Sequence, residues 1–198
     1  MAAAYAYDTV AVEAVLDDLF SRGSYEAVID DLVLPAVAAL GTAWADGRID
    51  VAAEHLASEA VQRRLAALFD LAGVPSVGRL VAVGLPPGCR HEIGTMAFAV
   101  ALRRRGVNVL YLGPDVPLAS WVHVTAEPTV DAAMVGIARP ADGGPGLEVV
   151  GAIAVARPDL LIAVGGPSGG AIGNAFAHVL ATRVTDAATE LAGLMAAR

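Results

Sequence analysis

The sequence predicts an α/β protein: an N-terminal four-helix bundle followed by a parallel five-stranded sheet with flanking helices. Two observations favour this order. Apolar residues recur every three to four positions over residues 1–73, which is typical of amphipathic helices. From Gly78 onward, short β-branched runs alternate with helical stretches, which is typical of a parallel sheet covered on both faces. We therefore expect a helical-bundle domain over 1–73 and a sheet domain over 78–198.

Two helices open the predicted bundle. Gly23 ends the first helix, and Ser24 is placed to cap the second. Pro35 should stop or kink that second helix, because proline lacks the amide hydrogen and its ring clashes with the preceding turn. The apolar residues of the first helix fall on one predicted face: Val10, Val12, Val15, Leu16, Leu19 and Phe20.

Two further helices complete the predicted bundle. The third is expected over 36–45 and ends at the Asp46-Gly47 turn. Asp50 can cap the fourth, which runs to Leu71. Short connections between the four helices indicate a small bundle.

The second domain is expected to alternate strands and helices. The predicted strands cover 80–84, 107–112, 132–137, 160–164 and, with a weaker pattern, 179–182. The predicted helices cover 92–105, 118–127, 147–156, 170–177 and 186–197. A glycine-rich loop is expected over 142–146. Ligands of such sheets bind at the carboxyl ends of the strands, so the residues that follow each strand are the candidates.

Composition narrows the function classes. The formal net charge is −8, which makes nucleic acid a poor partner because binding to phosphates needs a basic surface. The single cysteine, Cys89, excludes an intramolecular disulfide. The chain has no uninterrupted apolar run of about 18 residues, and its N-terminus lacks a basic stretch. We therefore expect no membrane span, no secretory signal and a cytoplasmic location.

Common catalytic patterns are missing from the sequence. The first strand is not followed by G-x-G-x-x-G, and the chain has no Walker A motif. We also find no Ser-His-Asp arrangement, no zinc-type ligand cluster and no paired carboxylates in a loop. We therefore expect a protein that is not an enzyme on its own.

One constellation does indicate a ligand. Cys89-x-His91-x-x-Gly94 follows the first strand, and Gly165-Gly166 follows the fourth. This pattern resembles the Rossmann-like (flavodoxin-like) cobalamin-binding domain, whose motifs are Asp-x-His-x-x-Gly, Ser-x-Leu and Gly-Gly. The resemblance implies that His91 is the lower axial ligand of cobalt, and a neutral imidazole suits that role. The further cofactor contacts that it implies are Arg90, Glu92, Ile93, Gly113, Asp115, Ala138 and Arg139.

The N-terminal half carries a second pattern. Trp44 is followed after nine residues by Glu54 and His55. This Trp-x9-Glu-His pattern resembles the helical cap of B12-dependent photoreceptors of the CarH and LitR type. The order of helical bundle and Rossmann-like domain is also similar to methionine synthase and to corrinoid methyl carriers. The resemblance covers nearly the whole chain and implies adenosylcobalamin as the cofactor.

The spacing of these cap residues fits an adenosyl contact. Val51, Glu54 and His55 share one helix face, because residues three and four apart are neighbours. Trp44 precedes the turn before that helix and offers a broad apolar plane, while Glu54 can accept ribose hydroxyl hydrogens. The alternative is a core tryptophan with a solvated Glu–His pair, and the joint occurrence with the His91 motif favours the cofactor.

The sequence departs from the family pattern at three positions. Cys89 replaces the acidic partner of the ligand histidine, and a thiol is a weaker hydrogen-bond partner than a carboxylate. Ala138 replaces the serine of Ser-x-Leu. Ala45 stands where well-known photoreceptors carry a histidine that caps cobalt after illumination, which leaves His55 and His123 as open alternatives.

These observations lead to one expected function and one alternative. We expect a stand-alone photoreceptor in which light cleaves the cobalt–carbon bond of adenosylcobalamin and changes the packing of the cap and the oligomeric state. No segment resembling the winged-helix DNA-binding domain is present, so the output is expected through a homo-oligomer or a separate output protein, without direct nucleic-acid or membrane binding. A similarity to photocobilins, which also hold biliverdin, leaves biliverdin open as a second chromophore. The alternative is a corrinoid methyl carrier of a methyltransferase system.

Overall fold

The structure, a computed structural model, describes residues 2–73, 78–172 and 176–198 of the chain. The chain divides into two compact units, residues 1–68 and residues 69–198, and the division falls inside one long helix, α5 (Val51–Leu71). Residues 74–77 lie outside the described residues, so the domain limits stay a prediction.

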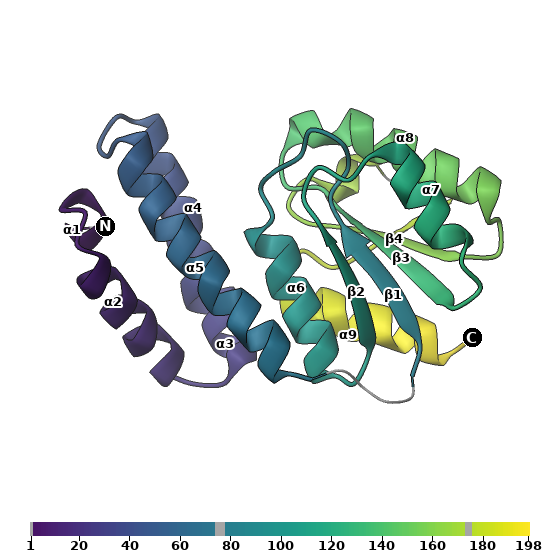
Figure 1. The fold of residues 1–198 in the computed structure, drawn as a ribbon, viewed down its shortest axis with the longest axis horizontal. Coiled ribbons are helices and arrows are strands. Elements are labelled where there is room, and N and C mark those ends of the chain that lie inside the picture. The colour runs from purple at the N-terminus through teal and green to yellow at the C-terminus, as the bar shows by residue number, and fades with distance from the viewer. Residues whose placement is uncertain (1, 74–77, 173–175) are drawn as a thin grey trace. The chain divides into compact units, whose positions relative to one another are not determined.

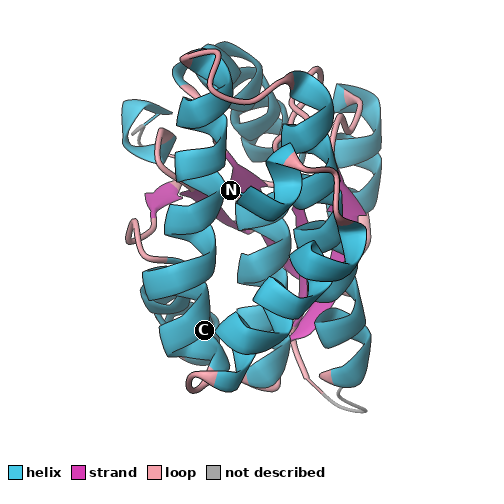
Figure 2. Ribbon diagram, turned by 90° about the vertical axis from the view of Figure 1, so that its left-hand side faces the viewer, coloured by secondary structure: helices cyan, strands magenta, loops and turns pink. Residues whose placement is uncertain are grey.

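The helical unit contains only helices and loops among its described residues (Figure 2). Its other elements are α1 (Ala2–Tyr5), α2 (Thr9–Ser21), α3 (Tyr25–Val28), the π-helical turn η1 (Ile29–Val33) and α4 (Leu34–Ala45). Both predicted caps are confirmed: Ser24 accepts from the amide of Ala27 at 3.3 Å, and Asp50 accepts from that of Ala53 at 2.8 Å. The four-residue helix α1 was not predicted.

Pro35 neither ends the second helix nor separates it from the third. The chain stays helical from Tyr25 to Ala45. The π-helical turn η1 lies just before Pro35, which belongs to the first turn of α4. The extra residue of a π turn relieves the clash between the proline ring and the carbonyl one turn earlier. Two predicted helices are therefore one irregular helix.

The first helix buries a narrower face than predicted. Val12 and Leu16 are buried, whereas Val10 is 78% and Val15 51% exposed. The six predicted positions span a wide part of the helix circumference, and the elements packed against this helix cover only a part of it.

One described helix, Tyr25–Ala45, is long and apolar enough to cross a membrane by length and composition alone. A core helix of a globular domain passes the same test, and this helix carries Asp30 and Asp31 in its interior. The finding is weak evidence for a membrane span.

The second unit is an α/β fold with one parallel five-stranded sheet, as predicted. Its strands are β1 (Leu80–Gly84), β2 (Asn108–Gly113), β3 (Val130–Gly136), β4 (Leu161–Gly165) and β5 (His178–Val179). They run in the order β2-β1-β3-β4-β5, which is the flavodoxin-like order. The strand order reverses between β1 and β3, where ligands of such sheets bind.

Four helices cover the sheet. They are α6 (Ile93–Arg104), α7 (Leu118–Ala126), α8 (Gly143–Ala156) and α9 (Val184–Ala196). Helices α6 and α9 pack together on one face, and α7 and α8 pack on the other (Figure 1). The core between the sheet and α7–α8 includes Trp121, Ile137 and Ile153, each with no exposed surface.

Three local predictions for this unit are wrong. The expected glycine-rich loop over 142–146 is the end of a 3-10 turn, η2 (Pro140–Asp142), followed by the first turn of α8. Pro145 is tolerated there because the first amides of a helix have no intrahelical partner. The expected helix over 170–177 is a short 3-10 turn, η3 (Gly169–Ile172), in its described part, while residues 173–175 lie outside the described residues. Strand β5 ends at Val179, three residues before the prediction.

Candidate functional site

The loops that follow the strands meet at the carboxyl edge of the sheet. The amide of Leu85, after β1, donates to the carbonyl of Gly113, after β2, at 3.0 Å. The amide of Ile137, after β3, donates to the carbonyl of Gly165, at the end of β4, at 2.8 Å. Four of the strand ends are therefore joined, and the candidate residues of the α/β unit lie in these loops.

His91 lies on the loop after β1, two residues before α6, and its side chain is exposed. Asp115 from the loop after β2 braces this loop. Its carboxylate accepts from the amide of Gly88 at 2.6 Å, and its own amide donates to the carbonyl of Cys89 at 2.9 Å. Arg90 lies 3.5 Å from the same carboxylate. Asp115 adopts φ +54°, an uncommon backbone conformation that aspartate tolerates better than most residues.

Cys89 is buried, and a carboxylate from another loop lies beside it. Burial and a hydrogen bond with Asp142 raise the pKa of the Cys89 thiol to about 11. Asp142 is itself only 3% exposed and accepts from the amide of Arg139 at 2.9 Å. The family's acidic residue is absent at position 89, yet the structure supplies an acidic group next to that position from the turn after β3.

A second, half-buried cluster holds the residue after His91. The hydroxyl of Tyr111, on β2, donates to the carboxylate of Glu92 at 2.8 Å. The Tyr111 ring lies 6.0 Å from that of Phe69, at the end of α5, and the guanidinium of Arg103 lies 3.4 Å from the Phe69 ring centre. Burial, with the hydrogen bond to Glu92, raises the pKa of Tyr111 far above its usual value.

Sequence reasoning missed both Asp142 and Tyr111. Asp142 stands at the start of the predicted glycine-rich loop, and its only signal is its place after the third strand. Tyr111 gives no signal, because a tyrosine in a β-branched run is typical of a strand.

The candidate glycines differ in what surrounds them. A Cβ on Gly94 or on Gly113 would meet no atom within 4 Å, so both face open space. Gly166 has φ +100°, and a Cβ there would lie 2.6 Å from the carbonyl oxygen of Ile137. The protein's own backbone thus requires a glycine at position 166. A Cβ on Gly165 would make only ordinary contacts.

The remaining residues of the predicted α/β site lie at the same edge. Arg139 is exposed, and Ile93 and Ala138 are half-buried. The structure therefore places all the predicted loop residues of this unit at one edge of the sheet.

Within the helical unit, Trp44 lies one residue before the end of α4 and is 51% exposed, so the alternative of a core tryptophan is wrong. Glu54 is half-buried on α5. The Ser58 hydroxyl donates to it at 2.6 Å, and Nδ1 of His55 lies 2.7 Å from its other oxygen. Val51, one turn earlier, is 49% exposed. The indole of Trp44 is therefore accessible, and the carboxylate of Glu54 is held in place by its two neighbours on α5.

The described residues contain no group of three or more His, Cys, Asp or Glu side chains placed to hold a metal ion.

Comparison with known proteins finds a match for the helical unit. Residues 2–69 match the family model described as a B12 binding domain. This match covers the helical unit and ends just past its boundary at residue 68.

Two curated relatives of this chain are transcriptional repressors of Myxococcus xanthus. The HTH-type transcriptional repressor CarA is 35% identical over 109 residues, which cover 55% of this chain and 36% of the repressor. The HTH-type transcriptional repressor CarH is 34% identical over 117 residues, which cover 59% of this chain and 39% of the repressor. The chain thus spans well under half the length of these relatives.

Solved structures share the whole fold of the chain. The monomethylamine corrinoid protein of Methanosarcina barkeri has a TM-score of 0.75 at 15% identity, covering 96% of this chain and 92% of its own. The methanol:cobalamin methyltransferase complex MtaBC of the same organism has a TM-score of 0.51 at 17% identity, covering 99% of this chain and 78% of its own. At this identity the likeness shows the fold alone.

Proposed function

We propose that the chain is a light sensor that binds adenosylcobalamin. The observation that carries this proposal is the exposed imidazole of His91 on a braced loop at the carboxyl edge of the sheet, in a chain whose residues 2–69 match the model of a B12 binding domain.

The α/β unit fits a corrinoid in two respects. The imidazole of His91 is accessible and is held by a loop that Asp115 fixes through two hydrogen bonds. Gly94 faces open space on the helix that follows. An accessible histidine beside bare backbone can ligate a metal that arrives inside a large flat ring.

The bound cofactor would supply a cobalt–carbon bond that light breaks. His91 would hold the cobalt, and Asp115 would fix the loop that carries His91 through its hydrogen bonds with Gly88 and Cys89. In the helical unit, Trp44 and Glu54 are the proposed contacts of the adenosyl group, because an exposed indole and a fixed carboxylate suit an adenine ring and a ribose.

The output in this proposal is a change of assembly. Loss of the adenosyl group would remove its contact with Trp44, so the packing of the helical cap and the oligomeric state would change. Similarity to transcriptional repressors of 34–35% identity favours a regulatory role, carried out in the cytoplasm by a homo-oligomer or through a separate output protein. Biliverdin as a second chromophore is part of the same proposal.

A corrinoid methyl carrier is the second candidate. The fold similarity to a monomethylamine corrinoid protein, with a TM-score of 0.75, favours it. A carrier exchanges methyl groups with partner methyltransferases, so it should prefer methylcobalamin over adenosylcobalamin. The accessible Trp44–Glu54 surface favours the adenosyl form.

The test is an absorption spectrum of the full chain with adenosylcobalamin in the dark and after green light, with and without biliverdin. The sensor predicts a bound corrinoid whose spectrum converts on illumination, together with a changed elution volume in gel filtration. His91→Ala should remove the histidine-ligated spectrum, while His178→Ala, at an exposed histidine on β5, serves as the matched control. Binding without photoconversion would favour the methyl carrier, and absence of corrinoid binding would refute both.

A further inference from the structure

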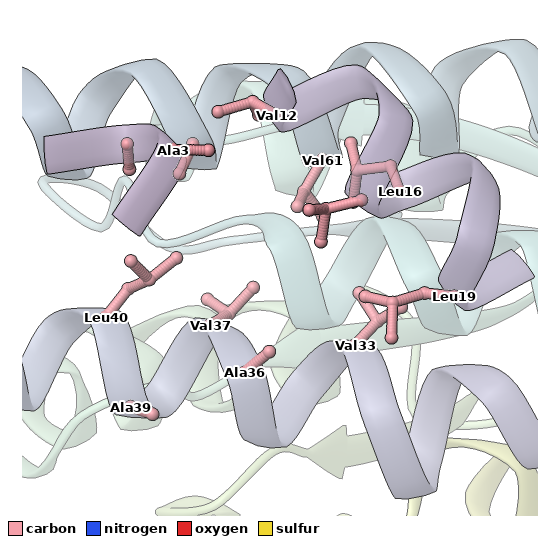
Figure 3. A pocket seen from close by; sticks show the side chains of 13 residues that line it. Ala3, Val12, Leu16, Leu19, Val33, Ala36, Val37, Ala39, Leu40 and Val61 are labelled. Carbon is pink, nitrogen blue, oxygen red and sulfur yellow. The ribbon is translucent and has the colours of Figure 1, made fainter. Parts of the chain in front are cut away.

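The helical unit contains an apolar cavity of about 210 Å³. Val12 and Leu16 of α2 point toward Val37 and Leu40 of α4, and Val61 of α5 lies on a third side (Figure 3). Every described residue that lines the cavity is an alanine, a valine or a leucine. The proposed cofactor contacts Trp44, Glu54 and His91 are not among them.

Small side chains keep this cavity open. Five of its lining residues are alanines: Ala3, Ala4, Ala36, Ala39 and Ala57. Longer aliphatic side chains at these positions would fill the space, and protein interiors normally leave few voids larger than a water molecule. The composition of the lining therefore maintains the cavity.

Polar contacts outside the cavity hold its walls in place. Arg63 of α5 lies 3.0 Å from the carboxylate of Glu13 on α2, and Arg64 lies 2.6 Å from that of Asp17. The hydroxyl of Tyr7, between α1 and α2, donates to Asp50 at the start of α5. Helix α2 is thus joined to α5 by side chains that do not line the cavity.

The lining selects the chemistry of an occupant. A buried water needs two to four polar partners, and this lining offers no polar side chain. A charged or hydrogen-bonding ligand would lose its hydration without compensation. A nucleotide or a tetrapyrrole with carboxylate groups is excluded on the same ground. An apolar molecule gains by leaving water and needs no partner.

We infer that the helical unit binds a small, uncharged, apolar molecule about the size of one hydrocarbon ring, between α2, α4 and α5. An apolar cavity of about 150 Å³ in another protein stays dry and holds benzene, so this larger one has room for such a ring. Ala36 and Ala39, which are exposed, form the rim through which it enters. This inference does not depend on the proposed function.

Benzene and benzoate are the matched probes for the full chain. The two share one ring and differ by a carboxylate, so a lining without polar groups should bind benzene and reject benzoate. Benzene is titrated into the protein, and binding is followed by the NMR chemical shifts of the valine and leucine methyl groups. We expect saturable binding with a Kd on the order of 1 mM, which lies within the binding free energy per atom that a ligand of about six heavy atoms can reach.

Two alanines of α4 provide the variant and its control. Ala36→Leu places three more carbons at the rim and should weaken benzene binding at least about tenfold. Ala38 is equally exposed but does not line the cavity, so Ala38→Leu should leave the Kd within about twofold. Thermal unfolding of both variants shows that each remains folded.

Three results would overturn the inference: no saturable benzene binding, equal binding of benzoate, or equal effects of Ala36→Leu and Ala38→Leu. A fourth result would also overturn it: benzene is displaced as the protein concentration rises, and sedimentation shows that the chain self-associates over the same range. The occupant of the cavity would then be a second copy of the chain.

Discussion

At the scale of single residues, Asp142 changes the interpretation of Cys89. The sequence shows only a missing acidic residue at position 89, whereas the structure places a buried carboxylate against the thiol. A carboxylate at position 89 would here face a like charge. The cysteine is therefore compatible with its surroundings in a way that the family's residue is not.

Cys89→Asp should consequently destabilise the protein by about 2 kcal/mol, because two close buried carboxylates cannot both ionise without cost. Urea unfolding of the full chain measures the loss. Cys89→Ser, which adds no charge, is the control, and the double variant Cys89→Asp with Asp142→Asn should recover most of the stability. If Cys89→Asp were as stable as the wild type, the two groups would not interact.

Tyr111 is a second residue whose role depends on its partner. Tyr111→Phe removes only the hydroxyl that donates to Glu92, the neighbour of His91. We expect a loss of about 1 kcal/mol in stability and, if the chain binds cobalamin, an affinity lower by about tenfold, as is typical when a support of a metal ligand is lost. Equilibrium titration measures the Kd, and Tyr5→Phe, at an exposed tyrosine, is the control. Unchanged affinity would limit Tyr111 to a packing role.

At the scale of elements, turn and cap chemistry explains which predictions succeeded. Ser24 and Asp50 cap helices as expected, because their side chains satisfy amides only a few residues away. Strands β1 and β4 were placed within one residue because their apolar runs are bounded by turn residues. Pro35 was misjudged because a π turn, supported by neighbouring helices, accommodates it within a continuous helix.

Gly166 lies where the loop after β4 closely approaches the loop after β3. Gly166→Ala would place a Cβ 2.6 Å from the Ile137 carbonyl oxygen at φ +100°, so we expect a loss of at least about 2 kcal/mol. Gly170→Ala is the matched control, because a Cβ there meets no atom within 4 Å. Thermal unfolding compares the two. Equal melting temperatures would show that the backbone at 166 adjusts freely.

The Tyr7–Asp50 contact between the α1–α2 turn and α5 predicts a pH dependence. The hydrogen bond from Tyr7 lowers the pKa of Asp50 below its usual 3.8 and raises that of Tyr7 above its usual 10.0. A carboxyl whose pKa is lower in the folded state stabilises that state above pH 4, and this contribution is lost as pH falls through the folded pKa. The raised pKa of Tyr7 contributes below pH 10, and that contribution is lost at higher pH.

Tyr7→Phe should therefore lower the melting temperature at pH 7, and the difference from the wild type should shrink toward pH 3. Tyr5→Phe again controls for removal of an exposed hydroxyl. A difference that stays constant from pH 7 to pH 3 would contradict the contribution of this hydrogen bond.

At the scale of the whole molecule, the two proposed ligands involve different residues. The apolar cavity lies wholly among residues of the helical unit, whereas His91 belongs to the α/β unit. We expect His91→Ala to leave benzene affinity unchanged and Ala36→Leu to leave corrinoid affinity unchanged, each within about twofold. A change in the second affinity caused by either variant would reveal a coupling between the sites.

The sequence by itself determined the class of fold, the order of bundle and sheet, and the histidine at the end of the first strand. Hydrophobic periodicity, helix caps and motif spacing are local properties of the sequence, so they do not depend on how the elements pack. Only the tertiary structure decided that Asp142 backs Cys89, that Tyr111 holds Glu92, and that the helices enclose an apolar cavity. These features join residues far apart in the chain, and no local pattern records which side chains meet when the elements pack.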